Sequence, residues 1–128
     1  RETVDVDVCV YGGTAAAVAA AVQLRGRGRT VAVVAPERRL GGMTAGGLSF
    51  TDSGARRAIG GLAQEFYREV GKRYGVAEEF RFEPHVAHHV LLEMALAHQV
   101  PVFHGHFLQG VGRRGRRLRL RLRRGGGG

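Results

Sequence analysis

The sequence contains few residues of several types, and each shortage excludes a class of site. Its 128 residues include a single cysteine, Cys9, and no tryptophan. One cysteine excludes an internal disulfide and any metal site built from several thiolates. Cys9 lies within an apolar pattern, so we expect it to be a small buried side chain in a strand. No apolar run approaches the roughly 20 residues that span a membrane, and we therefore expect no membrane partner.

Lysine is also scarce: of the 20 basic residues, only Lys72 is a lysine and the others are arginines. The net charge of +9 arises almost entirely near one end, since residues 113–124 contain eight arginines and no acid. A basic segment of this kind can bind nucleic acid through phosphate contacts. However, no aromatic residue follows Phe107 to provide a platform for base stacking. A basic nucleic-acid-binding module is therefore an alternative from a different functional class.

The first 35 residues have the pattern of a βαβ unit. Residues 4–11 become apolar after alternating Val and Asp, which predicts a strand entering a sheet. An alanine-rich helix is predicted over residues 14–24, where Val18 and Val22 are four positions apart. A second strand is predicted over residues 30–35 and ends at Pro36. This order indicates an α/β fold of the Rossmann type.

The turn between the first strand and the helix is suited to a dinucleotide pyrophosphate. Gly12 permits a tight turn, and the backbone N–H groups from Gly13 to Ala16 are expected to point at the phosphates from the helix N-terminus. Thr14 stands where the usual fingerprint has its second glycine. Its hydroxyl can donate a hydrogen bond to a phosphate. The predicted contacts are therefore Gly12, Gly13, Thr14, Ala15 and Ala16.

The end of the second strand normally carries an acid that binds the ribose hydroxyls. Ala35 occupies that position and cannot form this hydrogen bond. Glu37 can substitute if the chain bends at Pro36. Alternatively, Arg38 or Arg39 can meet a 2′-phosphate, which would favour NADP.

The remainder of the chain is predicted to hold a glycine-rich connection, two helices and three strands. Residues 38–61 contain seven glycines. A connection of this length without regular structure is unusual in a small domain unless it forms part of a binding site. Helices are predicted over 62–74 and 84–98, and strands over 100–104, 107–111 and 118–122. The last two strands are expected to form a hairpin. In it, Leu118, Leu120 and Leu122 alternate with arginines, which predicts a half-buried strand.

Five histidines provide a weaker candidate site. His85, His88 and His89 share one predicted helix face, and His104 and His106 share one strand face. A zinc site is conceivable from these residues. No acid or cysteine completes a ligand set, so we expect a partly exposed helix face and no metal.

A specific resemblance links these segments. The chain carries Tyr-Gly-Gly-Thr at 11–14, Leu-Gly-Gly-Met-Thr at 40–44, Ala-Ile-Gly-Gly-Leu-Ala at 58–63 and Phe-Glu-Pro-His at 82–85. Over residues 5–110 it resembles the amino-terminal part of the FAD-dependent oxidoreductases of glutathione-reductase-like fold, some of which are labelled xanthan lyase. The resemblance implies FAD as the cofactor. It places Gly12, Gly13 and Thr14 at the pyrophosphate, and Gly41, Gly42, Met43 and Thr44 along the flavin side.

We therefore expect an α/β, Rossmann-like FAD-binding βαβ domain that is incomplete and ends in a β-hairpin. Residues 1–112 are predicted to form the amino-terminal part of this domain, and 113–128 an Arg/Gly-rich hairpin strand and end. The expected function is flavin-mediated hydride or electron transfer with a small organic substrate. A plain NAD(P)-binding Rossmann domain is the alternative, although it does not need the second glycine loop. We expect 128 residues to cover only part of the flavin site. The sequence assigns no compartment, oligomeric state or catalytic residue.

Overall fold

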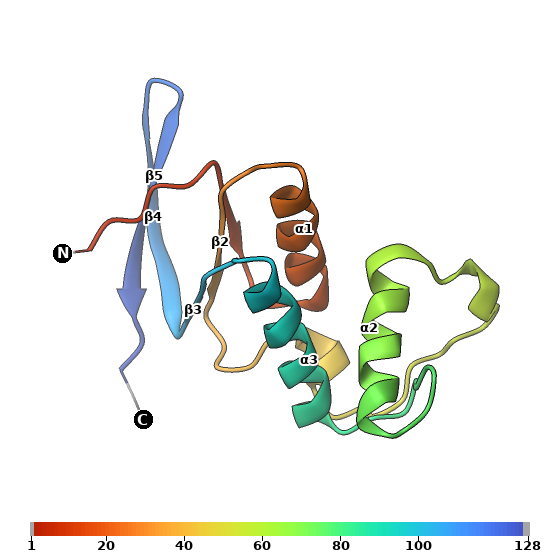
Figure 1. The fold of residues 1–128 in the computed structure, drawn as a ribbon. Coiled ribbons are helices and arrows are strands. Elements are labelled where there is room, and N and C mark those ends of the chain that lie inside the picture. Colours follow the sequence, from red (N-terminus) through yellow and green to blue (C-terminus); the bar gives the residue numbers. More distant parts are fainter. Residues whose placement is uncertain (1, 127–128) are drawn as a thin grey trace.

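The computed structural model describes residues 2–126, which form one parallel sheet, three α-helices and a separate hairpin (Figure 1). The sheet has the order β1-β2-β3. Its strands are β1 (Val8–Tyr11), β2 (Val31–Ala35) and β3 (Val102–His104), and the helices are α1 (Ala15–Gly26), α2 (Gly61–Arg73) and α3 (Pro84–Ala97). The α1 and α3 helices lie on one side of the sheet, and the hairpin lies on the other (Figure 1). This arrangement confirms the predicted α/β class.

The core fills the space between the sheet and the two neighbouring helices. All five residues of β2 are buried, as expected for a central parallel strand. From α1, Val18 and Val22 are buried against it together with alanines that allow close helix packing. Val8 and Val10 pack on this core, so the alternation along β1 directs Cys9 to the opposite face. Cys9 is therefore half-buried and not fully buried as expected, and this burial raises the pKa of its thiol.

The first strand begins later than the sequence predicts. Residues 4–7 were expected in the strand, but the ladder starts at Val8, whose N–H donates to Thr30 O at 3.1 Å. Asp7 lies just before the ladder, and its carboxylate accepts a hydrogen bond from Thr30 N. Hydrogen bonds from Thr30 lower the pKa of the Asp7 carboxyl. The other predicted elements agree with the structure to within a few residues. The long connection contains two short 3-10 turns, η1 (Gly42–Ala45) and η2 (Arg56–Ala58).

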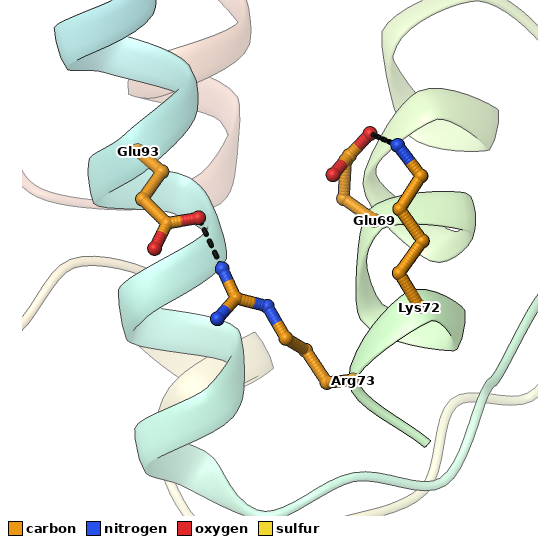
Figure 2. A network of polar contacts seen from close by, with 4 residues as sticks. All are labelled: Glu69, Lys72, Arg73 and Glu93. Carbon is orange, nitrogen blue, oxygen red and sulfur yellow. Dashed lines mark hydrogen bonds and ion pairs between the residues drawn. The ribbon is translucent and has the colours of Figure 1, made fainter. Parts of the chain in front are cut away.

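The second helix packs beside α3 through its apolar face. Phe66 and Val70 are buried in α2, as its spacing predicts. Figure 2 shows the polar side of this contact, where Arg73 of α2 reaches across to Glu93 of α3. A second pair, Glu69 with Lys72, lies within α2 (Figure 2). Both pairs are largely exposed, so they add little to stability compared with the apolar contact.

One arginine joins the carboxyl-terminal ends of α1 and α3. The Arg25 guanidinium donates to His98 O at 3.1 Å, to Arg29 O at 3.2 Å and to Gln99 Oε1 at 3.0 Å. A cation at the end of a helix also complements the negative end of its dipole. Arg25 thus fixes α1 relative to α3 at the end far from the glycine turn.

The hairpin is an independent two-stranded sheet formed by β4 (His106–Arg114) and β5 (Arg117–Arg124). Both strands are longer than predicted, and the predicted boundary between residues 112 and 113 falls within β4. Leu122 pairs with Leu108, and Leu120 pairs with Val111. The expected alternation is present, but the expected half-burial is incomplete: Leu120 is partly buried, whereas Leu118 is 63% exposed. The hairpin meets the sheet near its base, where Leu108 N donates to the Tyr11 hydroxyl at 3.1 Å.

None of the helices within residues 2–126 combines the length and the apolar character that a membrane-spanning segment requires.

Candidate nucleotide-binding site

The glycine turn lies at the edge of the sheet where all three parallel strands end. The register aligns Tyr11 with Val34 and Ala35 with His104, so the residues that follow each strand come together there. Gly12 N donates to Val34 O at 2.8 Å and continues the ladder by one bond. Its φ of +124° is a conformation that favours glycine and that turns the chain from β1 into α1.

The start of α1 presents free backbone donors at this edge. Thr14 is the N-cap: its Oγ1 accepts from Ala17 N at 3.1 Å, and its carbonyl accepts from Val18 N at 3.2 Å. Ala15 and Ala16 occupy the first two helical positions, where the backbone N–H groups have no carbonyl partner within the helix. Together with the helix dipole, these N–H groups make the turn a site for an anion. The capping role also explains why threonine is suitable at position 14.

Glu37 folds back onto the glycine turn. A Cβ built on Gly13 would lie 3.0 Å from Ala35 Cβ and 3.2 Å from Glu37 Oε2. Ala35 is completely buried, whereas Glu37 is exposed. The small side chain at 35 therefore fills the space below Gly13, and the carboxylate reaches the turn from two residues further on. The bend at Pro36 thus brings the Glu37 carboxylate to the turn. Arg38 is exposed, and the structure gives it no polar contact within residues 2–126.

The second glycine loop packs directly on the first. Gly41 N donates to Gly13 O at 2.7 Å, and Gly41 forms a parallel bridge with Thr14. A Cβ on Gly42 would lie 3.2 Å from Thr14 Cγ2. Met43 follows with its side chain 80% exposed, and Thr44 is half-buried in η1. The structure thus brings the two glycine motifs together, although they are separated by more than 25 residues in the sequence.

Two histidines contact the segment that carries Glu37. His88 of α3 accepts from Leu40 N at its Nδ1, at 2.8 Å, and His104 Nδ1 lies 3.3 Å from Glu37 O. Their rings are 6.3 Å apart between centroids. The sequence predicted a partly exposed helix face for His88 and a strand face for His104, but it did not predict these contacts, because a hydrogen bond from a ring to a distant backbone atom leaves no periodic signal. Within residues 2–126 no group of three or more potential ligands is arranged to hold a metal ion.

The capping role of Thr14 leads to a first prediction. Thr14→Ala removes the acceptor for Ala17 N and should lower the free energy of unfolding by about 1 kcal/mol. Thermal unfolding should then show a melting temperature lower by about 4 °C. Thr14→Ser keeps the hydroxyl and serves as the control, with a melting temperature near that of the parent. Equal melting temperatures for the two variants would show that the cap does not stabilise α1.

Comparison with solved structures finds the same fold within larger proteins. The crystal structure of AlpK matches with a TM-score of 0.64 and 17% identity, over 94% of this chain and 28% of that one. Bacillithiol disulfide reductase Bdr (YpdA) from Staphylococcus aureus matches with a TM-score of 0.62 and 14% identity, over 89% of this chain and 32% of that one. CabE, an aromatic hydroxylase from angucycline biosynthesis, matches with a TM-score of 0.63 and 19% identity, over 93% of this chain and 27% of that one. The chain therefore spans about a third or less of these proteins.

The comparison with protein families is more specific. Residues 7–125 match the family described as FAD dependent oxidoreductase. The match includes both glycine motifs and the whole hairpin, so the arginine-rich segment lies within the family's domain. No curated protein sequence gives a significant match. With a match over nearly its entire length, and with the fold and the glycine turn described above, the chain belongs to the FAD-dependent oxidoreductase family, whose cofactor is FAD.

Proposed function

We propose that the turn from Gly12 to Ala16 binds the pyrophosphate of FAD and that Glu37 binds the adjacent ribose. The observation that carries this proposal is the position of the Glu37 carboxylate, 3.2 Å from where a Cβ on Gly13 would stand. Free N–H groups suit an anionic phosphate, and a carboxylate beside them suits a ribose diol. Gly13 itself is buried, and its lack of a side chain lets the end of β2 and the Glu37 carboxylate pack close to the turn. The residues at the turn therefore fit a dinucleotide.

The loop from Gly41 to Thr44 is proposed to extend the site toward the flavin. Gly42 and Met43 are exposed next to Thr14, so their backbone groups are accessible to a ligand that passes the turn. When bound, FAD supplies the redox chemistry, through which hydride or electrons pass to or from a small organic substrate. The residues of this chain bind and orient the dinucleotide. The named relatives include a disulfide reductase and a hydroxylase, so the shared fold does not choose the substrate.

Glu37 also argues against NADP, one of the dinucleotides that the sequence left open. A carboxylate at the ribose disfavours a 2′-phosphate through like-charge repulsion, which argues against NADP. Arg39, which was considered as a 2′-phosphate ligand, lies near His88. Arg38 has no contact that directs it to the turn. The positions of Glu37, Arg38 and Arg39 support FAD over NADP as the bound dinucleotide.

The test is an equilibrium titration of FAD into the chain, followed by flavin fluorescence. ADP should compete with FAD, because it carries the ribose and the phosphates, and riboflavin should compete poorly. Glu37→Gln should weaken the binding of both FAD and ADP by about tenfold or more, since hydrogen bonds to a charged group contribute about 1.5–3 kcal/mol. Glu65→Gln, at an exposed position on α2, is the matched control and should bind FAD as the parent does. Competition by riboflavin but not by ADP would contradict the assignment, as would unchanged binding in Glu37→Gln.

A further inference from the structure

The segment between Glu37 and Leu40 is held at both ends by histidines. His104 contacts the carbonyl of Glu37, and His88 contacts the N–H of Leu40. Leu40 is completely buried, and the next residue, Gly41, donates to Gly13 O. The position of this segment therefore fixes two parts of the site at once, which are the Glu37 carboxylate beside Gly13 and the Gly41–Gly42 backbone beside Thr14.

The two histidine contacts respond differently to protonation. A backbone N–H can only donate, so His88 must present an unprotonated Nδ1 to Leu40. A backbone carbonyl can only accept, so His104 must carry a proton on its Nδ1. The His104 contact therefore survives when that ring becomes charged, whereas the His88 contact is lost when its Nδ1 is protonated. Only one of the two contacts is a pH-dependent element.

The surroundings of His88 oppose its positive charge. It is partly buried, and the groups that face it are His89 from its own helix, His104 from β3 and Arg39 from the connection after β2. Burial first, and then these neighbours, lower the pKa of His88 below its ordinary value, despite the hydrogen bond with Leu40. The folded state thus binds fewer protons at His88 than the unfolded state does. The contribution of His88 to stability is therefore greatest above about pH 6.5, the ordinary histidine pKa, and is lost as the pH falls through the lower pKa of the folded state.

We propose that His88 is a positioning residue for the nucleotide site, because its neutral imidazole holds Leu40 and its protonation releases the segment that carries Glu37 and Gly41. The direct consequence is a local change at Leu40 that follows the charge of His88. The second consequence rests on the proposed function: FAD binding weakens at acidic pH. A histidine that acts only through packing would produce neither effect.

The direct consequence is tested by NMR without FAD. The chemical shifts of the His88 ring and of the Leu40 amide are followed between pH 5 and 8, and both should move with the same midpoint. His88→Asn places an amide oxygen near the position of Nδ1 and cannot be protonated, so the Leu40 amide should become independent of pH. His98→Asn is the matched control, because His98 lies at the end of the same helix and contacts Met94 O. This control should leave the titration of Leu40 unchanged.

The second consequence is tested by measuring the dissociation constant of FAD at pH 7.5 and 5.5. The parent and His98→Asn should bind about three- to tenfold more weakly at the lower pH, as expected for the loss of one hydrogen bond. His88→Asn should bind equally at both values. If the chemical shift of the Leu40 amide does not follow the titration of His88, or if it still changes with pH in His88→Asn, the proposal is overturned. If FAD does not bind at any pH while Leu40 follows His88, the proposed function fails and the role of His88 stands.

Discussion

Replacing Gly41 with alanine should lower the melting temperature by about 10 °C and weaken FAD binding severely. Gly41 has a φ of +120°, and an L-residue in such a left-handed conformation costs about 1–2 kcal/mol. A Cβ at this position would also lie 2.6 Å from Ala45 Cβ and 3.1 Å from Leu91 Cδ1. Relieving that overlap adds about 1–3 kcal/mol. The loop must shift, and Gly41 N then loses its alignment with Gly13 O.

Two further glycines separate strain from overlap in this prediction. Gly47 has a φ of +114° but no atom within 4 Å of a built Cβ, so Gly47→Ala introduces strain without overlap. Gly26 has neither property, so Gly26→Ala should be neutral or slightly stabilising. Thermal unfolding and FAD titration are measured for all three variants. The largest loss is expected for Gly41→Ala, a smaller loss for Gly47→Ala and none for Gly26→Ala. A harmless Gly41→Ala would show that Gly41 is not packed against Ala45 and Leu91 as described.

A second large effect is expected at Gly71, in the last turn of α2. Alanine is usually preferred to glycine inside a helix by about 1 kcal/mol. Here, however, a Cβ would lie 2.7 Å from Val76 O, 2.9 Å from Ala77 C and 2.9 Å from Glu78 Cα. All three are backbone atoms, so the returning chain must move as a whole. We expect overpacking to outweigh propensity, with a net loss of about 2 kcal/mol and a melting temperature lower by about 8 °C.

The same Gly26→Ala variant is the control for Gly71→Ala, because it makes the same substitution at a helical glycine in open space. The segment that the added Cβ would displace, residues 76–78, precedes Phe80, whose ring stacks on Tyr67 with centroids 4.3 Å apart. Near-ultraviolet circular dichroism should therefore change in Gly71→Ala and not in the control. If alanine at position 71 raises the melting temperature, the packing of residues 76–78 on α2 is wrong.

The βαβ unit could be predicted from the sequence because its signals are local. Apolar residues mark β2, Pro36 ends it, and the alanine pattern fixes α1. The approach of Glu37 to Gly13 could be predicted only as an option, since it depends on how the chain bends after Pro36. The contacts of His88 and the tight packing of Gly71 were missed. Each joins a residue to backbone atoms of another segment, and neither changes the local spacing of apolar and polar residues.

The hairpin illustrates the opposite limit of sequence reasoning. The predicted hairpin is confirmed, and the structure pairs Leu122 with Leu108; alternation reports which side chains share a face. It also predicted burial of that face, and this was wrong for Leu118. Burial requires a second surface, and alternation contains no information about one. Within residues 2–126 the hairpin contacts the sheet near its base, and most of its length projects away (Figure 1).

The anchoring of α1 by Arg25 has a geometric consequence for the glycine turn. A helix of 12 residues is about 18 Å long and behaves as a stiff rod. Because three hydrogen bonds from Arg25 hold its far end, the direction of the rod is set there. A small rotation at Arg25 would swing the N–H groups of Ala15 and Ala16 sideways at the other end. The orientation of the donors proposed to bind phosphate therefore depends on an arginine at the other end of the helix.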